Sequence, residues 1–167
     1  MADNGEQGAA ASTQPKKEEG GRINTNFIKS PLGIVLIINF IFSFLAFCMM
    51  SGFLGDTGLR TGHFGFFMYA VTHTWVALLI IFILKLIKIH TLVDCISWEL
   101  TFAINTLIMT VILLIGSAVV AQRAAYYSDY HCDYINCHLI GACAFFGFAA
   151  MLGCAIQTFF HYKEWRA

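Results

Sequence analysis

Residues 32–54 read LGIVLIINFIFSFLAFCMMSGFL, an apolar stretch without one charged side chain. Three further uncharged stretches of similar length follow at residues 66–84, 100–121 and 139–160. Each is close to the ~20 residues that an α-helix needs to cross the ~30 Å hydrocarbon core of a bilayer. Barrel strands would alternate apolar and polar residues over ~10 positions, whereas these stretches are apolar on every side. The sequence therefore predicts an all-α membrane protein with four transmembrane helices.

The overall composition agrees with a membrane protein. Of the 167 residues, 58% are hydrophobic and only 12% are charged. Soluble proteins are on average roughly half apolar and a quarter charged, so water is the wrong solvent for this chain. Ten acidic and ten basic side chains cancel. Because phosphate binding needs a clustered positive excess, we expect no nucleic-acid partner.

The chain divides into one folded domain with a tail at each end. Residues 1–26 hold no large apolar side chain before Ile23. They cannot bury enough surface to fold, so we predict a disordered cytosolic tail without a cleavable signal peptide. Residues 27–163 form the predicted four-helix domain, and residues 164–167 form a short cytosolic C-terminus.

Lysine and arginine are distributed unequally between the two ends of the predicted helices. Arg60 and Arg123 lie at one end, and the others lie at the opposite end: Lys16, Lys17, Arg22, Lys29, Lys85, Lys88, Lys163 and Arg166. The positive-inside rule therefore predicts that both termini and the loop at residues 85–99 are cytosolic. Short connections predict that neighbouring helices run antiparallel in one bundle. The ammonium groups of Lys85 and Lys88 are expected to snorkel to the lipid headgroups.

Small and polar side chains mark the faces expected to lie inside the bundle. Helices in lipid associate by close approach and interhelical hydrogen bonds, not by hydrophobic expulsion. On the fourth stretch such residues recur at helical spacing from Cys143 onward. The positions predicted to pack helices together are Asn39, Asn105, Thr110, Cys143, Gly147, Ala150, Cys154 and Gln157.

His73 lies between Thr72 and Thr74, well inside the second apolar stretch. An ionisable residue at such depth is by default a functional-site hypothesis. A proton relay needs a second titrating partner, but no Asp, Glu, Lys or Arg lies within the four stretches. We therefore favour a neutral His73 that hydrogen-bonds to a neighbouring helix and helps to pack the bundle. The same absence weakens the case for an ion channel or transporter.

The segment HCDYINCH at residues 131–138 places two cysteines five positions apart in the second external loop. External compartments are oxidising, and a flexible loop easily brings two Cα atoms to the ~5.5 Å that a disulfide needs. We therefore favour a disulfide between Cys132 and Cys137. The alternative is a zinc site, since two His and two Cys form a legitimate ligand set. Because the adjacent His–Cys pairs are poorly spaced for tetrahedral chelation, no metal is expected.

Outside the predicted spans, the sequence offers few residues that could react or catalyse a reaction. Cys95 lies in the predicted cytosolic loop beside the membrane interface. Juxtamembrane cysteines are the usual palmitate acceptors, so Cys95 is a candidate for lipidation, with a free thiol as the equal alternative. No nucleophile with a base and an orienting group can be assembled. We expect neither enzymatic activity nor a cofactor.

Three segments are similar to those of a known family: FIKSPLG at residues 27–33, AFFGFAA at residues 144–150 and QTFFHYKEWR at residues 157–166. With Asp94 and the pair Trp98-Glu99 ahead of the third helix, they resemble the MARVEL-domain proteins. The likeness is nearest to the small members MAL, plasmolipin and the chemokine-like-factor group. It covers residues 27–166, and its specificity comes from the order of short motifs across four helices.

This resemblance implies a non-enzymatic tetraspan protein that organises membrane microdomains and membrane partners in vesicle trafficking or cell–cell apposition. The implied partners are membrane lipids, including those of cholesterol-rich or ordered domains, other membrane proteins and a second copy of the chain. The implied location is the plasma membrane or transport vesicles. The alternative is an accessory subunit that stabilises another membrane protein through lateral helix contacts. A channel or transporter is the third reading, and it requires a hydrated path lined by residues such as Asn39, His73, Thr110 or Gln157.

Overall fold

The computed structural model describes residues 24–58, 62–88, 97–130 and 137–166 of the chain. Every regular element in this part is a helix: α1 (Thr25–Ile28), α2 (Pro31–Thr57), α3 (Gly62–Leu86), α4 (Trp98–Tyr130) and α5 (Cys137–Arg166). Helices α2 to α5 are each long and apolar enough to cross a membrane. Among the described residues, the predicted all-α fold is therefore confirmed, with four helices whose length and composition suit a membrane span. Almost all of the predicted N-terminal tail falls outside the described residues.

The four long helices extend beyond the apolar stretches that predicted them. The largest extension belongs to α4, which was predicted over residues 100–121 and continues to Tyr130. Gln122 and Arg123 end the apolar run, but neither residue type breaks a helical backbone. The 33 residues of α4 span roughly 50 Å, which exceeds the ~30 Å hydrocarbon core. We infer that the helix ends reach the headgroup regions.

A short turn of helix, α1, ties the start of the bundle to the end of α3. The backbone N–H of Asn24 donates to the carbonyl oxygen of Leu86 at 2.7 Å. Ser30 then caps α2, because its hydroxyl accepts from the Gly33 N–H at 3.0 Å and donates to the Phe27 carbonyl oxygen at 2.6 Å. A serine in this position satisfies one of the free N–H groups at the start of a helix. The FIKSPLG segment therefore fixes the angle at which the chain enters the first long helix.

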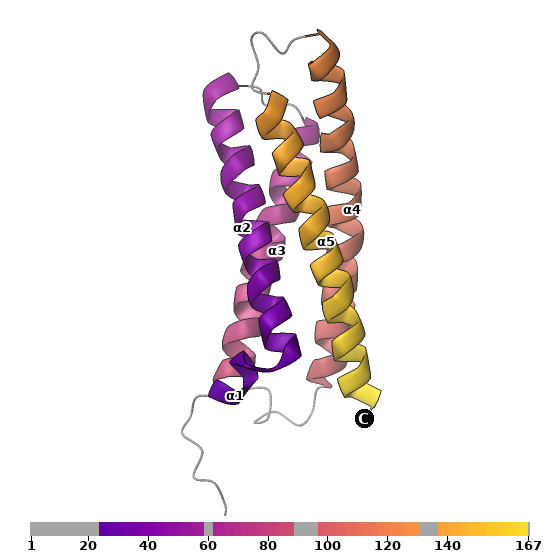
Figure 1. Ribbon diagram of the computed structural model, residues 1–167. Helices are drawn as coiled ribbons and strands as arrows, with labels where there is room; N and C mark the ends of the chain where they lie inside the picture. Colours follow the sequence, from indigo (N-terminus) through magenta and orange to yellow (C-terminus); the bar gives the residue numbers. More distant parts are fainter. Residues whose placement is uncertain (1–23, 59–61, 89–96, 131–136, 167) are drawn as a thin grey trace, which may run out of the picture.

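The long helices form an antiparallel bundle in which each packs against two others (Figure 1). Going round the bundle, the order is α2, α3, α4 and α5, and α5 returns to α2. The contact between α4 and α5 is the most extensive, followed by that between α2 and α5. Helix α1 and the end of α5 lie at the same end of the bundle. That this end is cytosolic stays a prediction from the lysine and arginine distribution.

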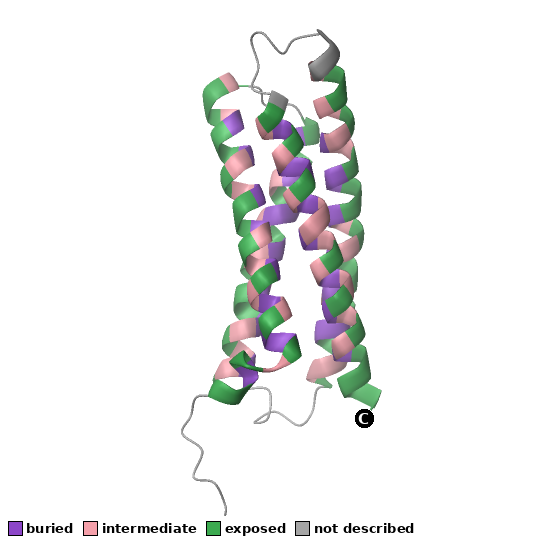
Figure 2. Ribbon diagram, in the orientation of Figure 1, coloured by how far each residue is buried: buried purple, intermediate pink, exposed green. Residues whose placement is uncertain are grey.

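Burial follows the inward faces of the helices, and the outward faces remain exposed (Figure 2). Away from α1, the interior is filled by the fully buried rings of Phe53, Phe64 and Phe67. The rings of Phe53 and Phe64 meet edge to face, with centroids 5.2 Å apart. Large apolar side chains point outward on all long helices, among them Ile38, Ile80, Leu107, Ile115, Phe145 and Phe159. This outer surface is suited to lipid.

Candidate functional site

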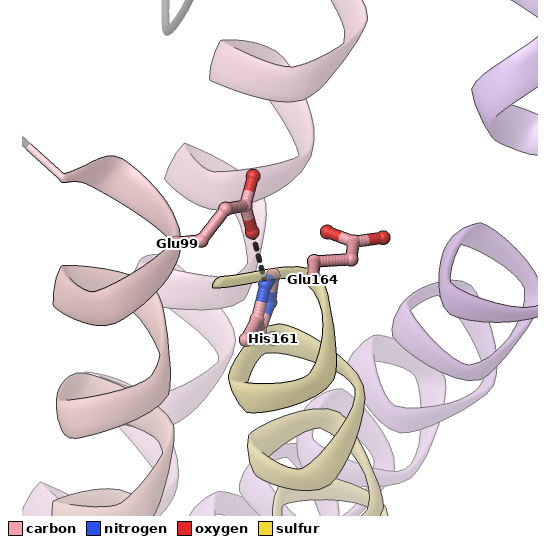
Figure 3. Close-up of side chains that lie close together, drawn as sticks. All are labelled: Glu99, His161 and Glu164. Carbon is pink, nitrogen blue, oxygen red and sulfur yellow. Dashed lines mark hydrogen bonds and ion pairs between the residues drawn. The ribbon is translucent and has the colours of Figure 1, made fainter. Parts of the chain in front are cut away.

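Three long helices bring charged side chains together at the end of the bundle that holds α1. Lys85 near the end of α3 binds Glu99 at the start of α4, and it also binds Glu164 near the end of α5. The distance between Lys85 Nζ and Glu164 Oε2 is 3.0 Å. One turn before Glu164, Nδ1 of His161 lies 2.9 Å from Oε2 of Glu99 (Figure 3). We call these four residues the ionic cluster.

Helix geometry explains why these residues meet. Glu99 lies in the first turn of α4, where the helix dipole favours a carboxylate, and Lys85 lies in the last turn of α3, where it favours a cation. His161 and Glu164 are three positions apart on α5, so they share one face. The antiparallel arrangement places these three helix ends side by side.

The ionic cluster lies deepest at its basic members. The side chain of Lys85 is 7% exposed and that of His161 is 0% exposed, whereas Glu99 is 22% and Glu164 is 46% exposed. Burying an unpaired charge such as that of Lys85 costs several kcal/mol of desolvation free energy. The ion pairs with Glu99 and Glu164 offset this cost and allow Lys85 to be buried. The ring of Phe102 lies beneath the cluster, with its centroid 5.7 Å from Lys85 Nζ and 5.5 Å from the His161 ring. The cluster thus closes one end of the bundle, with its acidic groups nearer to water.

Three members of the ionic cluster belong to residue types that bind metal ions. Ligand atoms of Glu99, His161 and Glu164 all lie within 4.8 Å of one another. Both carboxylates, however, already form ion pairs with the ammonium group of Lys85. The arrangement therefore acts as an ion-pair network that holds α3, α4 and α5 together.

A second polar contact joins α2 to α5 inside the spans. When the Asn39 amide is oriented so that both of its polar atoms are satisfied, it donates to the Ala150 carbonyl oxygen at 2.9 Å and accepts from the Cys154 N–H at 3.1 Å. Gly153 permits this approach, because a Cβ there would lie 2.5 Å from the amide carbon of Asn39. A side chain of α2 is therefore hydrogen-bonded directly to the backbone of α5.

A third close contact brings three helices together at Gly147 of α5. A Cβ at this position would lie 2.3 Å from the Ser117 hydroxyl on α4 and 2.8 Å from a ring carbon of Phe67 on α3. Both distances are shorter than van der Waals contact. Only glycine fits here, and its lack of a side chain lets the three helices approach, as small residues do in membrane bundles.

This geometry can be set beside known proteins. Residues 27–160 match the MARVEL family, described as a membrane-associating domain. The chain belongs to the MARVEL family. It is similar to MARVEL domain-containing protein 1 of Xenopus laevis, with 27% identity over 149 residues that cover 88% of this chain and 84% of the relative. It is also similar to CKLF-like MARVEL transmembrane domain-containing protein 7 of Mus musculus, with 29% identity over 130 residues that cover 78% and 66% of the two chains. No solved structure matches the chain.

In this MARVEL protein, most positions predicted to pack helices face the interior. The buried ones are Asn39, Cys143, Gly147, Ala150, Cys154 and Gln157. Asn105 and Thr110 are half-buried, and the Thr110 hydroxyl donates to the Thr106 carbonyl oxygen of its own helix at 2.8 Å. The hydroxyl contact between helices is made instead by Thr158, which donates to Thr106 Oγ1 at 2.9 Å. The sequence analysis did not predict this role for Thr158, although Thr158 directly follows Gln157.

The expectation that His73 packs against a neighbouring helix is wrong. His73 is exposed on the outer face of α3, and its ring stacks on that of Tyr69 with the centroids 5.9 Å apart. The buried polar residue is its neighbour Thr74. Because each residue turns a helix by about 100°, a shift of one position moves a side chain off the interior face. His73 therefore lies on the outer surface of the bundle.

The expectation that Lys85 snorkels to the headgroups is also wrong. Its side chain is buried in the ionic cluster, because carboxylates on two other helices lie within reach. Sequence reasoning therefore missed the cluster itself. The available signal was that Glu99 and Glu164 flank the third and fourth spans at the same predicted membrane face as Lys85.

The prediction for Gln157 is not matched by a contact, and the predictions for three cysteines are not tested. Gln157 was predicted to hydrogen-bond between helices, but neither polar atom of its buried amide has a partner among the described residues. The predicted disulfide between Cys132 and Cys137 and the candidate lipidation site Cys95 concern side chains that lie outside the described part of the chain.

Proposed function

We propose that this MARVEL protein is a non-enzymatic organiser of membrane microdomains and membrane partners, acting in vesicle trafficking or cell–cell apposition. The observation that carries the proposal is the distribution of polar and apolar side chains. The ionic cluster and Asn39 use polar groups for contacts between helices. The outer surface presents large apolar side chains such as Phe145 and Phe159, which are 66% and 64% exposed. Such a molecule meets its surroundings through lipid and through lateral contacts with other membrane proteins.

A channel or transporter would need a hydrated path through the bundle. The locations of the polar residues that could line such a path favour an organiser instead. His73 lies on the outside of the bundle. The Asn39 amide is hydrogen-bonded to the α5 backbone, and the Thr110 hydroxyl is hydrogen-bonded within its own helix. These three polar groups therefore do not line one route through the bundle, and the fourth candidate position, Gln157, is buried without a partner among the described residues. The family description, a membrane-associating domain, agrees with the organiser.

Proximity labelling from the predicted cytosolic N-terminal tail tests the proposal. We expect several membrane proteins of one compartment to be labelled above the level given by an unrelated four-helix protein in the same membrane. A variant with Phe145→Ala and Phe159→Ala alters only exposed side chains of α5. It should lose part of this labelling while its thermal stability stays unchanged.

Two results would contradict an organiser. An accessory subunit would label and co-purify with one dominant partner in fixed stoichiometry. A transporter would give saturable solute flux in liposomes that contain only the purified protein.

A further inference from the structure

The last two turns of α5 separate their charged side chains onto two sides. Glu164 binds Lys85 inside the ionic cluster at 3.0 Å. Lys163 and Arg166 are exposed on the other side of the helix. Neither Lys163 nor Arg166 forms an ion pair with a carboxylate of the residues that the structure describes. The inward carboxylate thus shares the charge of Lys85 with Glu99, whereas no carboxylate of the described residues forms an ion pair with the two outward cations.

Lys163 and Arg166 border an open surface hollow of about 440 Å³. Its lining residues are Phe159, Tyr162, Lys163 and Arg166, all on α5. Their spacing of three, four and seven positions places them on one face of the helix. The guanidinium of Arg166 lies 5.9 Å from the ring centroid of Tyr162, which holds it over the hollow. We call these four residues the basic hollow.

The basic hollow changes character along the helix axis. Phe159, which is 64% exposed, lies one turn closer to the bundle centre than Lys163 and almost two turns closer than Arg166. An apolar floor therefore leads to a cationic rim at the end of a membrane-crossing helix. A phospholipid has the same order, with acyl chains in the hydrocarbon and a phosphate at the interface.

We infer that the basic hollow binds an acidic phospholipid of the cytosolic leaflet, with Lys163 and Arg166 on the headgroup phosphate and Phe159 beside an acyl chain. A guanidinium forms paired hydrogen bonds to phosphate oxygens, and a lysine adds a point charge. The inference uses the predicted cytosolic orientation, because anionic lipids are concentrated in that leaflet. It does not depend on the proposed organising function, since it needs only that α5 is inserted in the predicted orientation.

Native mass spectrometry of the purified full-length protein tests this inference, with phosphatidylserine and phosphatidylcholine offered as competing lipids. We expect the protein to retain phosphatidylserine preferentially. Replacing Lys163 by Gln should weaken this preference about five-fold, the effect expected of one interfacial charge, and the double variant K163Q/R166Q should weaken it roughly 25-fold.

The matched control is Lys29→Gln, which removes one exposed positive charge at the same end of the bundle but outside the basic hollow. It should leave the preference unchanged, and all variants should unfold at the same temperature in phosphatidylcholine. An equal loss in Lys29→Gln would overturn the inference, because the attraction would then be diffuse. Absence of any phosphatidylserine preference would also overturn it, as would displacement of the lipid by soluble glycerophosphoserine at equal concentration.

Discussion

Lys85 in α3 and Glu164 in α5 lie 79 positions apart in the chain, yet 3.0 Å separates Nζ from Oε2. Glu99 of α4 binds the same ammonium group, so three helices share one buried cation. A slide of any of these helices by one turn, about 5.4 Å, would break the pairing. The ionic cluster therefore fixes the register of three spans whose surfaces are otherwise mostly apolar.

Removing the charge of Glu99 should destabilise the bundle more than removing that of Glu164. Glu99 forms ion pairs with both Lys85 and His161 and is 22% exposed, whereas Glu164 forms one ion pair, with Lys85, and is 46% exposed. Breaking a fully buried pair costs ~3–5 kcal/mol, so we expect about 2 kcal/mol for Glu99→Gln and under ~1 kcal/mol for Glu164→Gln. Denaturant unfolding in detergent micelles measures both. Equal losses would show that Glu99 is not the centre of the cluster.

Asn39 and Gly153 should be energetically coupled. Gly153→Ala places a methyl group 2.5 Å from the Asn39 amide carbon, which should cost about 1–3 kcal/mol through overpacking. In an Asn39→Ala background the amide is gone, so the same change should cost much less. A double-mutant cycle measures the coupling, for which we expect at least about 0.5 kcal/mol. Additive effects would mean that α2 and α5 do not approach closely at this point.

The sequence predicts some features of this fold well and others poorly, for physical reasons. The number of spans follows from the length of apolar stretches, which the bilayer thickness fixes. The interior face of α5 could be read from Gly147 and Cys154, because small residues mark close approach. His73 was misplaced because helices that are apolar all round carry no hydropathy pattern to fix their rotation. The burial of Lys85 depends on carboxylates of two distant helices, which no local pattern reveals.

Replacing Gln157 by Met should leave stability unchanged or raise it by up to about 1 kcal/mol. The buried amide has no partner among the described residues, and an unsatisfied buried polar group costs ~1–3 kcal/mol. Methionine has a similar shape without that penalty. Thr158→Val is the contrasting variant, since it removes the hydrogen bond to Thr106 and should lose about 0.6 kcal/mol. A clear loss of stability in Gln157→Met would show that the amide does bind a partner.

Cys132 and Cys137 are predicted to form a disulfide, because their loop is expected to face an oxidising compartment. Mass spectrometry of peptides from non-reduced protein should find the two residues joined. Cys48 is exposed in α2 within a predicted span and serves as an internal control that should remain free. Free thiols at residues 132 and 137 would point to a metal site or to the opposite membrane orientation.

The last prediction concerns Gly147, where α3, α4 and α5 meet. Adding a methyl group there places it 2.3 Å from Ser117 Oγ and 2.8 Å from the Phe67 ring. The helices must then move apart and lose contacts along the seam, so we expect Gly147→Ala to lower stability by about 1 kcal/mol and Gly147→Leu by up to ~3 kcal/mol. Thermal unfolding of the purified protein and its export from the endoplasmic reticulum are the measurements.

Two controls separate packing at Gly147 from effects on helix formation or insertion. A Cβ at Gly141, one and a half turns earlier on α5, meets no atom within 4 Å. Gly141→Ala should therefore show only the gain in helix propensity, about 0.5–1 kcal/mol, which is opposite in sign to Gly147→Ala. Phe145 is exposed, so Phe145→Leu should change little. Every variant keeps the span apolar and should insert normally. If Gly147→Leu is as stable and as well exported as Phe145→Leu, the three helices do not meet at Gly147.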